Sequence, residues 1–226
     1  KALLSLKDYN LRGRIEELAD AGITSFKIEG RLKNESYVRN VVRDYSLALD
    51  EIVSRRPSDY ERGSFGSVSG GFTPDTSKTF NRGYTELFID GRRGRWASMD
   101  AAKSMGEEIG SIASLNRDKS EIGLKFTDKD IVLNNGDGFS FVTKDGKVAG
   151  FRGDVCQGKT IRCKSTPSLF IGARIYRNIN AAFEKEIERK NCTREIRVKA
   201  VISFTMQEDG WKGTASASSE DGRTVS

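Results

Sequence analysis

The sequence predicts an α/β segment followed by β-rich segments, and three observations lead to this class. Apolar residues recur at helical spacing between about residues 34 and 52, after a short stretch with strand character. Short alternating runs separated by Asn-Gly and Asp-Gly turns fill about residues 106–176. A Gly- and Ser-rich connector at about residues 56–78 separates these patterns. We therefore expect parallel βα units of the kind that close into a barrel, then a small antiparallel barrel or sandwich, then the start of a further β-rich segment.

The first 55 residues are expected to alternate strand and helix. Ala2–Leu4 has the character of a short strand, and Asn10 can cap a helix that Gly22 would close. A second helix is expected to begin near Asn34 or Ser36, because an apolar stripe follows: Val38, Val41, Val42, Tyr45 and Ile52. This order is typical of parallel βα units whose sheet is covered by helices.

The stretch between those helices, Phe26–Arg31, has the pattern of a buried strand but contains charged residues. In a strand over Phe26–Gly30, Lys27 and Glu29 share one face, and Arg31 follows the strand. Unpaired charges in a barrel interior cost several kcal/mol, so they must pair with neighbouring strands, bind a ligand or face solvent at the barrel mouth, where barrel enzymes place their chemistry. We interpret Lys27, Glu29 and Arg31 as candidate catalytic residues; the alternative is an edge strand with surface charges.

Three motifs resemble peptidase family U32, the collagenase-like protease family. They are Ser5-Leu6-Lys7-Asp8-Tyr9, then Phe26–Arg31 with Lys33, Tyr37 and Val38, then Phe80-Asn81-Arg82-Gly83-Tyr84-Thr85. The resemblance implies a TIM-like barrel with an appended small β-barrel. It also implies that Lys7, Asp8, Asn81 and Arg82 bind substrate.

The resemblance leaves three functional readings open. Similarity to some U32 branches implies hydroxylation of a nucleobase in tRNA or ribosomal RNA, with prephenate as a suggested oxygen-donor source. The family name implies a peptidase, that is, a hydrolase of collagen-like or unfolded protein. The third hypothesis is a non-catalytic binding module. The sequence contains no His, which excludes an H-E-x-x-H zinc site and a Ser-His-Asp or Cys-His arrangement within these residues. We therefore rank RNA modification first.

A basic cluster beside an indole supports an RNA partner. Arg92, Arg93, Arg95 and Trp96 lie together after Gly91, and guanidinium and indole groups can hold phosphate and stack on bases. The net charge of +6 agrees with such a partner. The alternative is a solvated loop.

No metal site is expected within these residues. Cys156, Cys163 and Cys192 are interpreted as structural thiols of a reducing compartment. Some U32 relatives hold an iron–sulfur cluster through four cysteines, one of which follows the S-x-K-D motif. Here Asp8 is followed by Tyr9 and Asn10, so we expect no cofactor in this segment.

The β-rich part is predicted from short runs between turns. The expected strands are Ile109–Leu115, Ile122–Phe126, Ile131–Leu133, Phe139–Val142, Val148–Phe151, Thr160–Cys163 and Ala173–Tyr176. A helix is then expected from Asn178 or Asn180 to about Asn191. A final hairpin is expected to pair Val198–Met206 with Trp211–Ala217.

The chain has 226 residues, which is fewer than the ~250 residues typical of one whole barrel. We expect a fragment whose missing upstream barrel domain completes an enzyme, and which is inactive alone. The expected parts are 1–55 (barrel units), 56–105 (linker with the basic loop), 106–194 (β-barrel and helix) and 195–226 (start of a truncated domain). With no apolar run of the ~20 residues that span a bilayer, we expect a cytoplasmic protein; the oligomeric state is left open.

Overall fold

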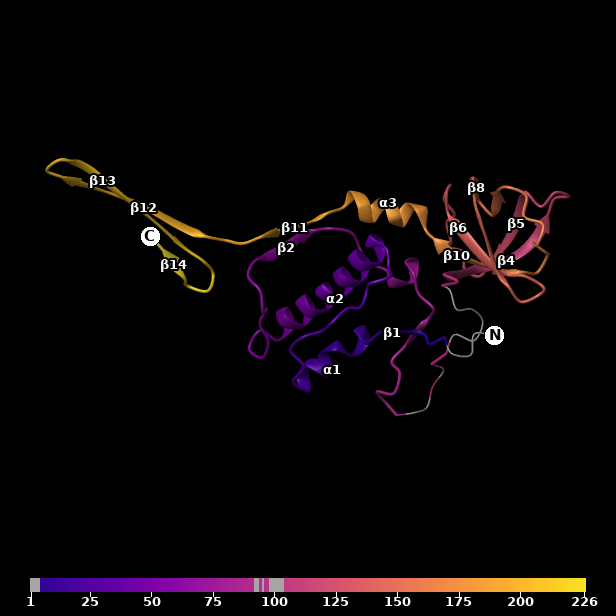
Figure 1. Cartoon of the computed structure of the whole chain (residues 1–226), viewed down its shortest axis with the longest axis horizontal. Helices are drawn as coiled ribbons and strands as arrows, with labels where there is room; N and C mark the ends of the chain where they lie inside the picture. The colour runs from indigo at the N-terminus through magenta and orange to yellow at the C-terminus, as the bar shows by residue number, and fades with distance from the viewer. Residues whose placement is uncertain (1–4, 92–93, 95, 98–103) are drawn as a thin grey trace. The chain divides into compact units, whose positions relative to one another are not determined.

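The computed structural model describes all residues except 1–4, 92–93, 95 and 98–103. The chain forms two compact units. The first consists of Lys1–Leu49 and Thr73–Arg189, and the second of Asp50–Phe72 and Lys190–Ser226. Figure 1 shows the course of the chain through its helices and strands.

The two predicted N-terminal helices are confirmed. After a 3-10 turn η1 (Arg12–Arg14), helix α1 spans Ile15–Asp20, and helix α2 spans Glu35–Arg55. Gly22 ends the first helical turn with φ of +90°, a conformation that a residue without Cβ adopts at little cost. The Asn34 side-chain oxygen accepts a hydrogen bond from the backbone N–H of Tyr37 at 3.1 Å and so caps α2.

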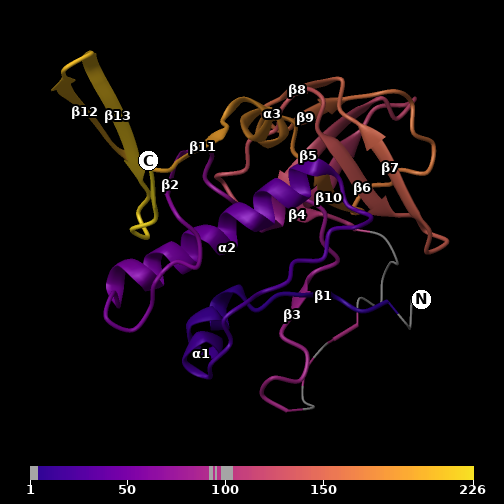
Figure 2. The ribbon, with the colours of Figure 1, turned by 60° about the vertical axis from the view of Figure 1, so that its left-hand side comes forward.

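A short parallel pairing joins two of the sequence motifs. Strand β1 (Asp8–Tyr9) pairs with strand β3 (Tyr84–Thr85), with Asp8 opposite Tyr84. Figure 2 shows the two strands running side by side. The pairing continues beyond the strands, because the N–H of Asn10 donates to the carbonyl of Thr85 at 3.0 Å. Parallel pairing of residues 76 positions apart thus brings the S-x-K-D and F-N-R-G-Y-T motifs together.

The predicted strand over Phe26–Gly30 is wrong. Residues 23–30 are extended but form no strand, because none of the strands in the described part of the chain pairs with them. Phe26 and Ile28 are half-buried, whereas Lys27 and Glu29 face solvent. The predicted strand Ala2–Leu4 lies outside the described residues.

The predicted antiparallel β segment is confirmed as a seven-stranded sheet curled into a half-barrel. Its order is β7-β6-β10-β4-β5-β9-β8, and all its pairs are antiparallel. The strands are β4 (Glu107–Leu115), β5 (Glu121–Phe126), β6 (Gly138–Val142), β7 (Val148–Arg152), β8 (Val155–Gln157), β9 (Thr160–Arg162) and β10 (Arg174–Ile179).

The inner face of the curl is an apolar core. Its largest fully buried side chains are Phe139, Phe141, Ile109, Ile112, Ile122, Ile161, Leu169 and Ile175. Gly110 makes the β4–β5 approach possible, because a Cβ there would lie 2.2 Å from the carbonyl oxygen of Lys125.

Two local predictions in this sheet are wrong. Ile131–Leu133 is not a strand, because its backbone groups bond elsewhere. The Ile131 N–H donates to the carbonyl of Asp128 in a turn, and the Val132 carbonyl accepts a hydrogen bond from the Arg177 guanidinium at 2.7 Å. Strand β8 was not expected, since its three residues carry too short a pattern to separate from the turn before them.

A buried ion pair connects the turn Asn135-Gly136-Asp137-Gly138 to helix α3 (Ala181–Arg189), the helix predicted there. Asp137 is fully buried and accepts hydrogen bonds from the N–H groups of Ala181 at 2.8 Å and Asn134 at 2.9 Å. Its carboxylate lies 3.6 Å from Arg177, which also pairs with Glu107 at 2.9 Å. One carboxylate therefore holds the turn, the start of α3 and strand β10 together.

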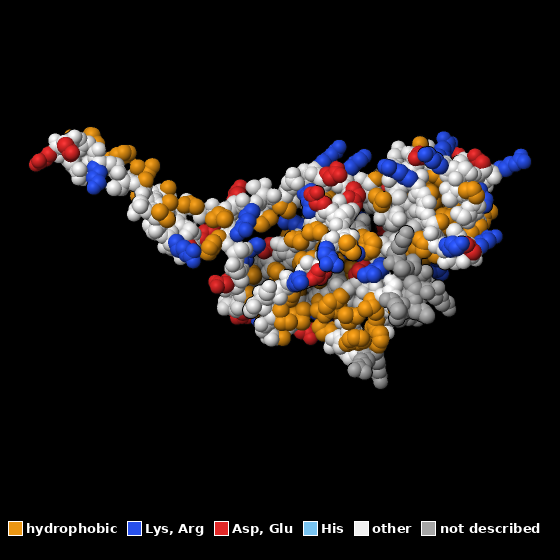
Figure 3. All heavy atoms as spheres, viewed as in Figure 1, with side chains coloured by type: hydrophobic (Ala, Val, Ile, Leu, Met, Phe, Trp, Pro, Cys, Tyr) orange, Lys and Arg blue, Asp and Glu red, His pale blue; other side chains and the backbone are white. Residues whose placement is uncertain are grey.

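In the second unit the predicted hairpin is confirmed. Strand β12 (Lys199–Gln207) pairs with β13 (Gly210–Ser218), which pairs with β14 (Thr224–Val225). One hairpin face gathers Ile202, Phe204, Met206 and Trp211, all exposed, and Figure 3 shows apolar side chains uncovered along this hairpin.

The Gly- and Ser-rich connector at residues 56–78 is predicted to be an irregular loop, but it contains a strand. Its residues Ser67–Gly70 form strand β2, paired with β11 (Cys192–Glu195). That partner lies more than 120 residues further along the chain, so local composition gave no signal of the pairing.

Replacing Asp137 with Ala is expected to destabilise the protein by about 3–5 kcal/mol, because the substitution leaves the Arg177 charge buried with one carboxylate fewer and leaves two N–H groups without acceptors. Urea unfolding measures the change. Asp154→Ala, at an exposed turn position, is the control and should shift stability by less than about 0.5 kcal/mol. Equal effects of the two substitutions would contradict the role of Asp137.

Candidate functional site

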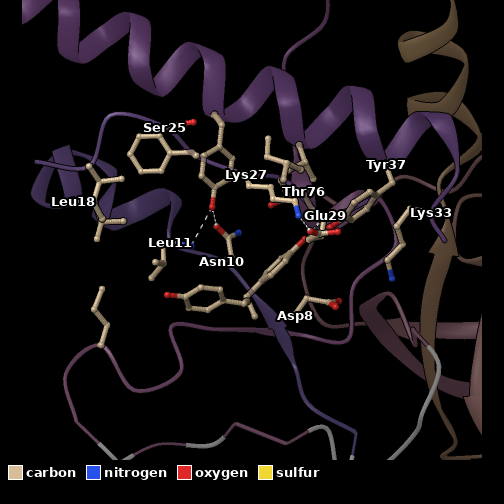
Figure 4. Close-up of a pocket in the computed structure, with 18 of the residues that line it drawn as sticks. Asp8, Asn10, Leu11, Leu18, Ser25, Lys27, Glu29, Lys33, Tyr37 and Thr76 are labelled. Atoms are coloured by element: carbon tan, nitrogen blue, oxygen red, sulfur yellow. Dashed lines mark hydrogen bonds and ion pairs between the residues drawn. The ribbon is translucent and has the colours of Figure 1, made fainter. Parts of the chain in front are cut away.

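A cavity of about 550 Å³ opens in the first unit between β1, the extended segment 23–29, the start of α2 and β3. Figure 4 shows the residues that line it. The wall contains four tyrosines and one phenylalanine: Tyr9, Tyr37, Tyr45, Tyr84 and Phe26. Its volume lies within the roughly 300–1,000 Å³ range of small-ligand sites.

Asp8 and Arg82 form an ion-paired latch on one wall of the cavity. The Asp8 carboxylate accepts hydrogen bonds from the Arg82 backbone N–H at 2.8 Å, from Nη2 at 2.8 Å and from Nε at 3.3 Å. The Asp8 side chain is 13% exposed, and such a partly buried fork between charged groups is stronger than a neutral hydrogen bond. Both residues were predicted to bind substrate, and the structure brings them together as partners of each other.

Buried Asn40 positions the opposite wall. Its side-chain N–H donates to the carbonyl of Asp75 at 2.8 Å and to the hydroxyl of Thr79 at 3.0 Å, while its oxygen accepts the Asp75 N–H at 2.9 Å. These bonds fix α2 against the 3-10 turn η2 (Thr76–Lys78) and the Phe80 that follows.

Two of the tyrosine hydroxyls are held by hydrogen bonds. The Tyr84 hydroxyl donates to the carbonyl of Thr76 at 2.8 Å, and burial raises the pKa of Tyr84 to about 12. The Tyr45 hydroxyl donates to Asn10 at 2.8 Å and accepts the N–H of Leu11 at 3.1 Å. These rings are therefore rigid parts of the cavity wall.

Lys33 brings a cation to the cavity. Its ammonium lies 3.2 Å from the ring centroid of Phe80 and 5.6 Å from that of Tyr37, favourable cation–π geometry. Burial lowers the pKa of Lys33, an effect that the Asp8 carboxylate opposes and Arg82 reinforces. Among the described residues, its ammonium has no carboxylate partner and no hydrogen bond.

The predicted catalytic residues lie at the cavity's edge. Lys27 and Glu29 line it and pair with each other at 2.8 Å, but their side chains are 84% and 73% exposed. The Glu29 carboxylate raises the pKa of Lys27, which keeps its ammonium protonated at neutral pH and leaves little free amine to act as a general base. Arg31 is exposed and does not line the cavity.

The other predicted binding residues have structural contacts. Lys7 donates its backbone N–H to the carbonyl of Trp96 at 2.8 Å, and the Trp96 ring packs edge-on against Phe88 at 4.8 Å. The Asn81 side chain stabilises the turn around it, because its oxygen accepts a hydrogen bond from the Gly83 N–H at 3.2 Å. The predicted RNA-binding residues Arg92, Arg93 and Arg95 lie outside the described residues.

The described residues contain no cluster of three or more His, Cys, Asp or Glu side chains suited to a metal ion. Burial raises the pKa of Cys156 to about 11 and also raises the pKa of Cys163, so both thiols are poor nucleophiles and poor metal ligands at neutral pH.

The sequence analysis selected the exposed Lys27 and passed over the half-buried Lys33. Lys33 and Tyr37 were part of the quoted motif, but Lys33 precedes helix α2, and nothing local indicates that its ammonium lies over the Phe80 ring. Tyr45 had been interpreted as part of an apolar helix stripe, and its hydroxyl bond to Asn10 spans 35 residues.

Fold and cavity define an α/β segment with a ligand-sized aromatic site, joined to a curled β-sheet. Residues 1–98 match the sequence profile of peptidase family U32, so this part of the chain carries the sequence pattern of that family.

Relatives of two kinds match. The chain is 38% identical over 157 residues, 70% of its length, to 23S rRNA 5-hydroxycytidine C2501 synthase of Escherichia coli, and covers 23% of that protein. It is 32% identical over 96 residues, 42% of its length, to a collagenase of Porphyromonas gingivalis, and covers 24% of it. It is 42% identical over 59 residues, 26% of its length, to tRNA hydroxylation protein P2 of Bacillus subtilis, and covers 19% of it.

The chain spans about a quarter or less of the length of these relatives. No solved structure is significantly similar to it. In the part of the chain that the structure describes, no helix combines the length and apolar character needed to cross a membrane.

Replacing Asp8 with Asn is expected to destabilise the β1–β3 pairing by about 1.5–3 kcal/mol, since hydrogen bonds to charged groups have this magnitude. Faster hydrogen exchange of the Asp8 amide, which bonds the carbonyl of Gly83, measures the opening. Asp44→Asn, which breaks an Arg–Asp pair with the exposed Arg12, should cost less than about 1 kcal/mol. Unchanged exchange in Asp8→Asn would contradict the latch.

Tyr84 is expected to titrate near pH 12 instead of its ordinary 10.0. Because the folded pKa is the higher one, the neutral phenol stabilises the fold fully below pH 10 and this contribution disappears as the pH rises towards 12. Phenolate absorbance and urea unfolding in this range should both differ between the wild type and Tyr84→Phe. A Tyr84 that ionises near pH 10 would show the ring to be solvated.

Proposed function

We propose that this chain is part of an RNA-modifying enzyme of family U32, and that the whole protein hydroxylates a nucleobase. One observation carries the proposal. The alignment with the 23S rRNA 5-hydroxycytidine synthase covers 157 chain residues, whereas the family profile covers 98, so at least 59 aligned residues lie beyond residue 98. The similarity therefore extends into the curled β-sheet, in a protein whose name states an RNA substrate.

The cavity is compatible with such a substrate. Its tyrosine walls offer surfaces on which a base can stack, and Lys33 supplies positive charge. An enzyme that acts on a base must take it out of its stack into a pocket of this kind.

We propose further that residues 1–55 belong to a TIM-like barrel in the whole protein. The parallel β1–β3 pairing and the exposed apolar side chains of Leu6, Tyr9 and Ile23, of which Tyr9 and Ile23 line the cavity, support this arrangement. An RNA substrate would place the protein in the cytoplasm. No cofactor is assigned to the residues of this chain.

A peptidase is the second candidate, since the 96-residue alignment with a collagenase favours it. The chemistry visible in the described residues gives it little support. The chain has no His, the thiols of Cys156 and Cys163 have raised pKa values, and the raised pKa of Lys27 makes that amine a poor general base.

The test is a strain that lacks the gene encoding this chain. Mass spectrometry of nucleosides from its ribosomal RNA and tRNA should show the loss of one hydroxylated nucleoside, restored by the wild-type gene. Arg82→Gln should fail to restore it, because the latch is lost, whereas Arg12→Gln, at an exposed ion pair, should restore it.

An unchanged nucleoside profile would refute RNA hydroxylation. Cleavage of denatured collagen by the purified full-length protein, abolished by Glu29→Gln, would instead establish the peptidase.

A further inference from the structure

The cavity contains one cation without an anionic partner in the described part of the chain. The Asp8 carboxylate is already engaged by Arg82 through three hydrogen bonds. Lys27 is neutralised by Glu29 at 2.8 Å. The ammonium of Lys33 contacts the rings of Phe80 and Tyr37, while Asp8 and Arg82 act on its charge without forming an ion pair or hydrogen bond with it. In the described part of the chain its N–H groups therefore have no acceptor and are available to a ligand.

The surroundings hold Lys33 in this unpaired state. Asn40 anchors α2 to the segment that leads into Phe80, and the centroid of the Phe80 ring lies 3.2 Å from the ammonium. A cation placed over a ring and partly removed from water keeps its orientation without a counter-ion, and the charge is then available to an incoming anion.

The remaining polar groups of the cavity point to the same kind of ligand. Arg82 uses Nε and Nη2 on Asp8, and its Nη1 has no hydrogen-bond partner among the described residues. The Tyr37 hydroxyl likewise has no such partner, although Tyr37 itself is only 9% exposed. Three donors thus accompany aromatic walls, and donors without acceptors suit an anionic group attached to a planar ring.

We propose that Lys33 binds the phosphate of the target nucleotide while the tyrosine-lined part of the cavity receives its base. This inference rests on the proposed function and names the residue that holds the RNA substrate in that site. Lys33, rather than Lys27, performs this role, because Lys27 is 84% exposed and already paired. A hydrated, neutralised lysine adds little to binding, whereas a partly desolvated and unpaired one interacts strongly with an incoming anion.

The test measures binding of cytidine 5′-monophosphate and of cytidine to the full-length protein by NMR titration. The wild type should bind the monophosphate more tightly than the nucleoside. Lys33→Gln should weaken monophosphate binding by roughly tenfold or more and leave cytidine binding unchanged, because only the phosphate contact is lost. Lys33→Arg should recover part of the difference.

Lys144→Gln is the matched control. Lys144 also lies over a phenylalanine, with its ammonium 5.3 Å from the Phe170 ring centroid, but does not line the cavity. This substitution should leave both affinities unchanged. If Lys33→Gln does not fold, as judged by its thermal transition, Tyr37→Phe provides the second probe and should weaken monophosphate binding alone.

Equal affinities of the wild type for cytidine and its monophosphate, or no effect of Lys33→Gln, would overturn the inference. Benzoate binding as tightly as the monophosphate and displacing it would assign Lys33 to a ring carboxylate instead, and would also overturn it. The nucleoside profile of the deletion strain is independent of these titrations. Loss of a hydroxylated nucleoside together with an inert Lys33→Gln would refute the inference alone, whereas an unchanged profile with phosphate-dependent binding would refute the proposed function alone.

Discussion

The ion pair between Asp8 and Arg82 is the contact on which the candidate site depends. It joins Asp8 and Arg82, which lie 74 residues apart, next to the parallel pairing of β1 and β3, two strands of two residues each. Two-residue strands contribute few backbone hydrogen bonds, so a charged fork with three contacts supplies much of what holds them together. Without it, Tyr9 of β1 and Tyr84 of β3, which both line the cavity, would lose support for the strand pairing that positions them.

The same pair determines the electrostatics of the cavity. Because Arg82 and Asp8 neutralise each other, the net charge of the enclosed wall comes from Lys33. Asp8 nonetheless acts on Lys33 by opposing the effect of burial on its pKa. A carboxylate that belongs structurally to the latch therefore also helps to keep the neighbouring ammonium charged.

The sequence predicted elements with local signals and missed those that depend on distant partners. The caps at Asn34 and Gly22 and the turn at Asn134–Gly138 act on adjacent backbone, and they were predicted correctly. The strand expected at Phe26–Gly30 had suitable alternation, but a strand also needs a neighbour to pair with. Strand β2 shows the opposite case, since a Gly- and Ser-rich segment became a strand through a partner near residue 193.

The candidate site shows the same division in chemical terms. The alternating pattern of apolar and charged residues correctly placed Lys27 and Glu29 on one side of the chain. Because they are neighbours there, their charges pair with each other and neither is left to bind a ligand. Lys33 differs by its surroundings and not by its type, since Phe80 and Tyr37 replace the carboxylate and water that surround Lys27. A motif can name both lysines, but only the three-dimensional arrangement distinguishes a cation that is already satisfied from one that a ligand must satisfy. Partial burial of the Lys33 ammonium, which no local sequence pattern indicates, therefore favours Lys33, at the end of the motif, over Lys27, at its centre, as the ligand-binding lysine.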